Sequence, residues 1–226
     1  MQLFACKDTT ETELFQVFIG FSLHLTNKFT RLRKYYDSID HGILKALLRR
    51  KFKDPVLLCV FDKIIDSYCV TEGRGLPIGN LTSQYFANIY LSTMDHYAKQ
   101  SLRACIYIRY MDDILIVDND RQKLKMIVQE FSQYAAVNFR LTLKPPIYRR
   151  NKDGQVFLGY KVKPYTMTLS GRSKKRYRSR LMECHRNYEN GKWSEQTYQE
   201  HLMPLTAFVM HAESKMLRRS CIKMIE

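Results

Sequence analysis

The chain has 226 residues, 45% of them hydrophobic and 12% aromatic, which is sufficient for one sizeable core or for one large lobe with a small appendage. It carries 37 Lys and Arg against 22 Asp and Glu, for a formal net charge of +15. This excess indicates a polyanionic partner, of which nucleic acid is the commonest, although a basic protein that touches only acidic proteins would show the same balance.

Two further features of the composition argue against metal-cysteine sites and membrane insertion. The six cysteines form no C-x-x-C pair and have no histidine at ligand spacing, which disfavours both a zinc site and a disulfide framework. We therefore expect a reduced, cytoplasmic compartment. The most apolar stretch near the start, residues 13–25, is too short to span a bilayer and lacks the features of a signal peptide. No membrane partner is predicted.

Helices are predicted from residue 34 onward. In "DSIDHGILKALLRRKF", Ser38 or Asp40 caps a helix with one apolar face. The next helix has Asp54 as its cap and Pro55 at its first position. A turn-rich loop, "EGRGLPIGN", leads into a long helical pattern over 80–99. The apolar face of the first helix is formed by Ile43, Leu44, Leu47 and Leu48.

The second half of the chain mixes strands and helices. "CIYIRY" and "ILIVD" are rich in β-branched and aromatic residues and flank "MDD", which predicts a hairpin with two acids at its tip. A helix is predicted over 121–137, a single strand over 155–162, and a basic helical tail from 172 with a turn at 190–193. The fold class is therefore α+β, built around an antiparallel hairpin.

The hairpin tip carries Asp112 and Asp113 inside an otherwise apolar run. Burying an unpartnered charge is costly, so these acids need a counter-ion. Divalent cations are one solution, because Mg²⁺ prefers carboxylate oxygens and two such ions about 4 Å apart can hold both oxygens of a phosphoryl transfer. The alternative is a solvated Asp-Asp turn. The hydrophobic strands on both sides favour the metal site.

Four segments in the same order resemble the motifs of reverse transcriptases: "RKYYDSIDHGIL", "GLPIGNLTSQYFANIYLSTMDHY", "YMDD" and "VFLGYKV". This resemblance implies a right-hand polymerase with an antiparallel palm over 33–170 and a small, basic, helical thumb over 171–226. Residues 1–32 resemble no fingers subdomain, so the fingers are expected to be missing and the chain truncated at its start.

The subtype is indicated by the run from Ile78 to Gln84, which is similar to the I-G-x-x-x-S-Q pattern of diversity-generating retroelements. In that family the enzyme copies a template RNA into cDNA that rewrites a variable gene. The resemblance implies RNA-templated DNA synthesis with two Mg²⁺ ions on Asp112 and Asp113. It implies as partners the template RNA, its cDNA primer duplex, deoxynucleoside triphosphates and a small basic accessory protein.

One position departs from the family pattern. Where the family opens its first motif with a third acid, this chain has Arg31, and a permanently charged guanidinium cannot bind Mg²⁺. Asp37, on the far side of the aromatic step, is not expected to substitute. We hypothesise that residues 1–32 are out of frame or foreign; a divergent but folded N-terminus is the other interpretation. Either way, we expect synthesis to be impaired.

The resemblance assigns further roles to individual residues, each with an ordinary structural alternative. Lys144 could assist the leaving pyrophosphate, although a solvated lysine is the simpler interpretation. The nucleotide and template site would use Tyr36, Gly79, Ser83, Gln84 and Tyr110, and the primer grip Phe157, Leu158 and Gly159. The nucleic-acid backbone would contact Lys174, Lys175, Arg176, Arg178 and Arg180.

Each of these roles has a structural alternative, and so does the function of the whole chain. Tyr36 could be core packing, Gln84 could satisfy backbone groups at a helix start, and the basic run could be a solvated helix face. For the whole chain, a second hypothesis is a catalytically inactive nucleic-acid-binding remnant of a reverse transcriptase. A third is a basic accessory module that binds a partner protein, against which the ordered motifs argue.

Overall fold

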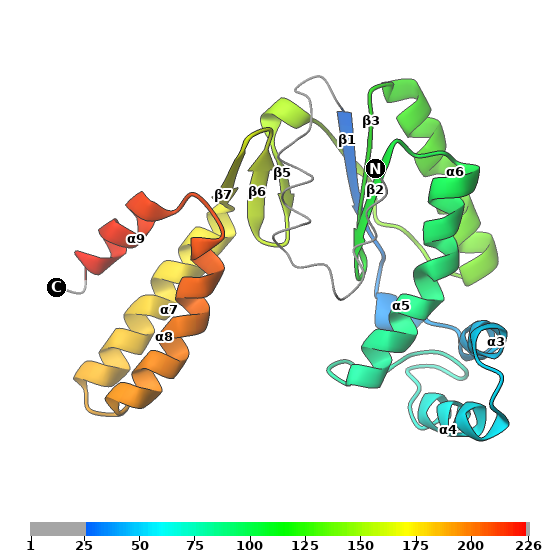
Figure 1. Cartoon of the computed structure of the whole chain (residues 1–226), viewed down its shortest axis with the longest axis horizontal. Coiled ribbons are helices and arrows are strands. Elements are labelled where there is room, and N and C mark those ends of the chain that lie inside the picture. Colours follow the sequence, from blue (N-terminus) through cyan, green and yellow to red (C-terminus); the bar gives the residue numbers. More distant parts are fainter. Residues whose placement is uncertain (1–25, 225–226) are drawn as a thin grey trace. The chain divides into compact units, whose positions relative to one another are not determined.

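The computed structural model describes residues 26–224, and these divide into two compact units (Figure 1). The first unit extends to Arg149, and the second begins at Arg150. Each unit has its own antiparallel sheet and its own packed helices. The mixed α+β class is confirmed. None of the helices within residues 26–224 is both long and apolar enough to cross a membrane.

The first unit contains a four-stranded sheet and most of the helices. Its elements in chain order are β1 (Thr26–Arg31), α2 (Tyr35–Ser38), α3 (His41–Lys51), α4 (Pro55–Asp66), α5 (Leu81–His96), the π-helical turn η1 (Tyr97–Ser101), β2 (Ile106–Tyr110), β3 (Asp113–Asp118), α6 (Arg121–Phe139) and β4 (Ile147–Arg150).

The sheet has the order β2-β3-β1-β4, with β3 antiparallel to both of its neighbours. Because side chains alternate along a strand, Ile114 and Ile116 face the helices while Asp113 and Leu115 face the other side. Ile114 and Ile116 are fully buried in one cluster with Tyr107 of β2 and the apolar faces of α5 and α6. The predicted hairpin is confirmed: β2 and β3 pair directly on either side of a two-residue turn.

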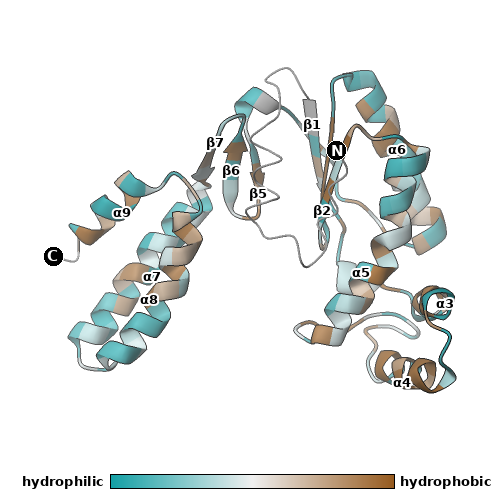
Figure 2. Ribbon diagram, viewed as in Figure 1, coloured by the Kyte–Doolittle hydropathy of each residue, from teal (hydrophilic) through white to brown (hydrophobic). Residues whose placement is uncertain are grey.

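The predicted helix starts are also confirmed. The carboxylate of Asp40 accepts the backbone N–H of Ile43 at 3.1 Å and caps α3. Asp54 accepts the N–H of Val56 at 2.8 Å, and Pro55 occupies the first position of α4, where its missing N–H costs nothing. Figure 2 shows α4 as largely hydrophobic, and its exposed face includes Val56.

Helix α5 runs through the core of the first unit. Phe86, Tyr90 and Met94 are buried on it, and the Tyr90 hydroxyl donates to the carbonyl of Phe139 at 2.8 Å, which ties α5 to the end of α6. The helical pattern predicted over 80–99 is thus confirmed. The chain continues without a break into the π-helical turn η1.

The second unit combines a small sheet with a helical hairpin. Its elements are the 3-10 turn η2 (Asn151–Asp153), β5 (Gln155–Phe157), β6 (Tyr160–Lys163), β7 (Thr166–Leu169), α7 (Gly171–Glu189), α8 (Glu195–Met210) and α9 (Lys215–Ile222). The sheet has the order β5-β6-β7 and is antiparallel throughout. Helices α7 and α8 pack side by side, and the turn predicted at 190–193 joins them (Figure 1).

The prediction of one continuous strand over 155–162 is wrong. Leu158 and Gly159 have φ values of 49° and 88°, and this two-residue turn separates β5 from β6. Two positive φ values in succession give the right-handed hairpin twist that joins tightly paired strands. The alternation of apolar residues concealed the turn, because leucine rarely adopts positive φ and only Gly159 signals it.

Gly159 is also a point of close packing. Its carbonyl accepts the hydroxyl of Ser173 on α7 at 2.6 Å. An added Cβ would lie 2.9 Å from that hydroxyl oxygen and 3.1 Å from Cζ of Phe208 on α8. The turn is therefore fitted directly against both long helices of the second unit.

Replacing Gly159 by alanine should destabilise the second unit by about 1–3 kcal/mol, because it adds both positive-φ strain and a steric overlap. Gly191 is the matched control, since it has a φ of 66° but nothing within 4 Å of an added Cβ. Urea unfolding of Gly159→Ala and Gly191→Ala should give the larger loss for the first. Equal losses would mean that strain alone matters at Gly159.

Candidate active site

The two acids of the hairpin lie where its second strand begins. Met111 and Asp112 form the turn, and Asp113 is the first residue of β3. In the register of the sheet, Asp113 lies opposite Tyr110 of β2 and Arg31 of β1. The Asp113 side chain is 9% exposed and that of Asp112 is 35% exposed. The turn therefore presents one buried and one half-exposed carboxylate.

Arg31, the last residue of β1, binds Asp113 with two hydrogen bonds. Its Nε donates to Oδ1 at 2.5 Å and its Nη2 donates to Oδ2 at 2.8 Å, while the same Nε lies 3.5 Å from Oδ2 of Asp112. The hydrogen bond and charge of Asp113 raise the pKa of Arg31 above its ordinary value, against the opposing effect of burial. Both oxygens of Asp113 are thus engaged by a permanent cation.

Asp112 is in a different electrostatic position. Its partial burial and the neighbouring charge of Asp113 raise its pKa, while the cations of Arg31 and Lys144 act in the opposite direction. Lys144 itself is exposed, and its backbone N–H donates to the carbonyl of Arg31 at 2.8 Å. The positive charges of Arg31 and Lys144 therefore oppose the negative charges of Asp112 and Asp113, where β1 ends and β3 begins.

The residues present do not fit a site for two Mg²⁺ ions. Each ion in such a site is usually bound by one or two free carboxylates, together with water and substrate phosphates. Here the oxygens of Asp113 are bound to Arg31, and a guanidinium lies within 3.5 Å of Asp112 and would repel a divalent cation. Within residues 26–224, no cluster of three or more His, Cys, Asp or Glu side chains could hold a metal.

A second ion pair supports the hairpin from the helix side of the sheet. Arg109 of β2 makes two hydrogen bonds of 2.7 Å to Asp95 of α5, and Nη1 also donates to the carbonyl of Met111 at 3.2 Å. Asp95 accepts the Tyr107 hydroxyl at 2.8 Å as well. Burial alone would lower the pKa of Arg109, but Asp95 outweighs it and the pKa is raised.

This pair was missed by the sequence reasoning, although a signal for it was present. Arg109 interrupts an apolar strand in "IYIRY", and Asp95 lies on a buried stretch of a helix. Charges in such places require partners, so two of opposite sign could have been matched. Through the carbonyl of Met111, the pair fixes the turn that carries the acids.

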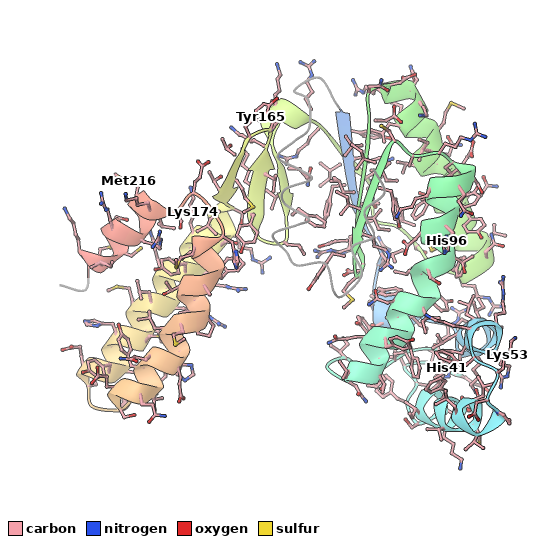
Figure 3. The ribbon with its side chains drawn as sticks, viewed as in Figure 1. His41, Lys53, His96, Tyr165, Lys174 and Met216 are labelled. Carbon is pink, nitrogen blue, oxygen red and sulfur yellow. The ribbon has the colours of Figure 1, made fainter. Side chains whose placement is uncertain are left out.

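The structure brings three of the four predicted motifs together. The N–H of Leu32 donates to the carbonyl of Asp112 at 3.0 Å, which joins the residue just before the first motif to the hairpin turn. The N–H of Leu76 donates to the carbonyl of Tyr36 at 3.0 Å, which joins the first motif to the glycine-rich loop. His41, labelled in Figure 3, holds that loop through a 2.8 Å contact between Nε2 and the Gly75 carbonyl oxygen.

The residues predicted to bind nucleotide lie in different surroundings. Tyr36 is half-buried, and burial together with the charge of Asp112 raises its pKa, which places it near the acids. Tyr110 is 40% exposed beside Asp113. Gly79 has a φ of 95° and faces open space, whereas Ser83 is buried in the core. Their roles stay predictions.

Gln84 is half-buried near the start of α5. Asn80 caps this helix, because its side chain accepts the N–H of Thr82 at 3.3 Å. For Gln84, both the helix-start role and the template role that the family resemblance implies stay predictions.

The remaining predicted residues belong to the second unit. Phe157 is buried, and Leu158 and Gly159 form the β5–β6 turn, so the primer-grip residues are parts of a hairpin. Helix α7 buries Tyr177 and Leu181, while its predicted phosphate contacts are exposed. These are Lys174, labelled in Figure 3, and Lys175, Arg176, Arg178 and Arg180.

The family model described as reverse transcriptase (RNA-dependent DNA polymerase) matches residues 29–161, which is more than half of the chain. The chain belongs to the reverse transcriptase family. The matched range includes Arg31 and begins before residue 33, where the palm was predicted to start. Residues 26–31, within the segment left unassigned, form β1 of the sheet. The origin of the residues before them stays a hypothesis, as do the predicted domain boundaries.

Among curated relatives, the chain is 35% identical over 72 residues to an uncharacterized 91 kDa protein in a cob intron of Schizosaccharomyces pombe (strain 972 / ATCC 24843). This alignment covers 29% of the chain and 9% of that protein. The reverse transcriptase chain thus corresponds to a small part of the curated relative's length.

Solved telomerase structures share the fold. The structure from Candida tropicalis in complex with a TWJ fragment of telomeric RNA matches 87% of this chain and 40% of its own, with a TM-score of 0.57 and 14% identity. The corresponding structure from Candida albicans matches 94% and 42%, with a TM-score of 0.53 and 15% identity. The polymerase fold predicted from the motifs is confirmed, and the chain spans less than half of each telomerase.

Removing the partner of Asp113 should destabilise this reverse transcriptase domain. Arg31→Gln leaves a nearly buried carboxylate with an uncompensated charge, so we expect a loss of about 1–3 kcal/mol in the free energy of unfolding. Adding Asp113→Asn should recover much of that loss, because no buried charge is left. Arg33→Gln, at an exposed position, is the control for charge alone. Chemical denaturation measures all four proteins, and no recovery in the double variant would refute the pairing.

Proposed function

We propose that this chain is part of a reverse transcriptase of the diversity-generating retroelement type, and that it binds a template RNA–cDNA primer duplex while Arg31 impairs nucleotidyl transfer. Membership of the reverse transcriptase family supports RNA-templated DNA synthesis in general. The narrower type rests on the run from Ile78 to Gln84. The substrates would be deoxynucleoside triphosphates, with a small basic accessory protein as a further partner.

The impairment rests on one observation, the bidentate ion pair between Arg31 and Asp113. In phosphoryl transfer, catalysis depends almost entirely on positioning and on neutralising charge at the reacting phosphate. A carboxylate paired with a guanidinium is a poor ligand for a divalent cation, because the positive charge of the guanidinium repels the ion. Loss of that carboxylate, in addition to the acid replaced by Arg31, should slow synthesis severely.

The same observation also supports the second hypothesis, a catalytically inactive nucleic-acid-binding remnant. Both hypotheses require duplex binding, and they differ only in whether some extension persists. The exposed cations of α7 support nucleic acid as the partner in either case, because α7 buries its apolar residues and presents its charges to solvent.

Neutralising the α7 surface should weaken duplex binding. We expect Arg176→Gln with Arg180→Gln to raise the Kd for an RNA–DNA hybrid and to lower the slope of log K against log salt by about 0.9 for each phosphate that the protein no longer neutralises. The matched control is Lys53→Gln with Lys125→Gln, which removes the same charge from exposed positions of the first unit. Fluorescence anisotropy at several salt concentrations measures both. Equal effects in the two variants would remove α7 from the interface.

Restoring an acid at position 31 should raise activity. We expect Arg31→Asp to extend a primer on an RNA template at least about tenfold faster than the unaltered chain, since each factor of ten needs only about 1.4 kcal/mol of transition-state stabilisation. Arg31→Ala is the control that removes the cation without adding a ligand. Asp112→Asn in the Arg31→Asp background should abolish the gain.

The outcomes of the extension assay separate the hypotheses. Slow extension that improves with Arg31→Asp supports an impaired enzyme. No extension by any variant, with duplex binding intact, supports the inactive remnant. Extension by the unaltered chain that Arg31→Asp does not improve would refute the impairment.

A further inference from the structure

We propose that Arg31 serves as a built-in counter-ion for the acid pair, so that this chain binds its template–primer duplex without help from divalent cations. The inference rests on the proposed duplex binding and adds how the site is neutralised. In a site of free carboxylates, bound metal ions offset the repulsion between the acids and nucleic-acid phosphates. Here a side chain of the protein occupies the same oxygens.

Hydrogen bonds at the end of β1 position Arg31 beside the two acids. The carbonyl of Arg31 accepts the N–H of Lys144, and the hydroxyl of Thr30 donates to the carbonyl of Lys144 at 2.9 Å. On the other side, the N–H of Leu32 donates to the carbonyl of Asp112. The end of β1 is therefore bonded both to the 142–144 segment and to the hairpin turn, which fixes the guanidinium over the acids.

The charges at the site balance. Asp112 and Asp113 contribute two negative charges, and Arg31 and Lys144 contribute two positive ones that act on them. A bidentate guanidinium pair is geometrically specific and keeps its charge at any working pH. A phosphate that approaches the end of β1 consequently meets a cluster with no net charge rather than two unpaired carboxylates.

By thermodynamic linkage, this charge balance predicts how the duplex affinity changes when Mg²⁺ is added. Mg²⁺ can strengthen duplex binding through this site only if it binds here, and the guanidinium competes for the oxygens it needs. The unaltered chain should therefore have nearly equal duplex affinities with and without Mg²⁺ at constant ionic strength. Arg31→Gln frees both carboxylates, and Arg31→Asp adds a third. Each should then show a gain in affinity of about fivefold or more on adding Mg²⁺.

The experiment is fluorescence anisotropy with a labelled RNA–DNA hybrid that has a recessed primer. Each protein is titrated in EDTA and in MgCl₂, with KCl adjusted to hold the ionic strength constant. Lys125→Gln, which loses a cation at an exposed site on α6, measures the general effect of Mg²⁺ on the nucleic acid. The gains of the Arg31 variants are compared with the gain of this control.

Folding is controlled with a second variant. Arg31→Gln combined with Asp113→Asn has no unpaired carboxylate at the buried position, and it should bind duplex with little dependence on Mg²⁺. Circular dichroism confirms that each variant is folded. If the double variant were as dependent on Mg²⁺ as Arg31→Gln, Asp113 would not be the group that Arg31 neutralises, and the proposal would fail.

Two results would overturn the inference. One is a Mg²⁺-dependent gain in affinity of fivefold or more in the unaltered chain at constant ionic strength. The other is the absence of a gain in both Arg31→Gln and Arg31→Asp. If the unaltered chain bound no duplex in either buffer, the proposed function would fail as well. Electron paramagnetic resonance of Mn²⁺ would then test the counter-ion directly, and equal Mn²⁺ binding by the unaltered chain and Arg31→Asp would contradict it.

Discussion

A buried carboxylate is costly unless it is paired, and two pairs of opposite charge lie on either side of the sheet near the turn of one hairpin. On the helix side of the sheet, Asp95 is paired with Arg109, which also holds the carbonyl of Met111. On the opposite side, Asp113 is paired with Arg31. Removing one partner of such a pair is far more costly than replacing both, so each pair stabilises the turn only while both of its members are present. The position of both acids depends on them.

Much of this architecture could be predicted from local sequence signals. Aromatic and β-branched runs around "MDD" predicted the hairpin. The caps predicted at Asp40 and Asp54 are confirmed, because a short acidic side chain just before a helix accepts the free N–H groups of the first turn. The turn at Leu158 was not predictable from alternation, since a hairpin and a strand share the same period. The partner of Arg31 depends on a β1–β3 register that joins residues far apart in the sequence.

The fold and the chemistry of this reverse transcriptase domain are separable. The sheet, the helices behind it and the loop below Tyr36 are arranged as in a polymerase, and telomerases with about 15% identity share that arrangement. A fold hosts an activity only through the groups placed on it. Here the scaffold is intact around a site where one side chain has the wrong sign of charge for metal binding. Arg31 lies outside the cluster of buried residues that forms the core.

Arg31 and Asp113 lie opposite each other on β1 and β3, and this pairing has a consequence for codon changes at position 31. Aspartate and arginine codons differ at more than one base, and the shortest path between them by single-base changes passes through glycine or histidine. Glycine at this position would leave Asp113 without a counter-ion, and histidine would supply one only when protonated. Both intermediates should therefore give a less stable protein than arginine does. At this position stability consequently favours arginine over both of these one-base substitutions.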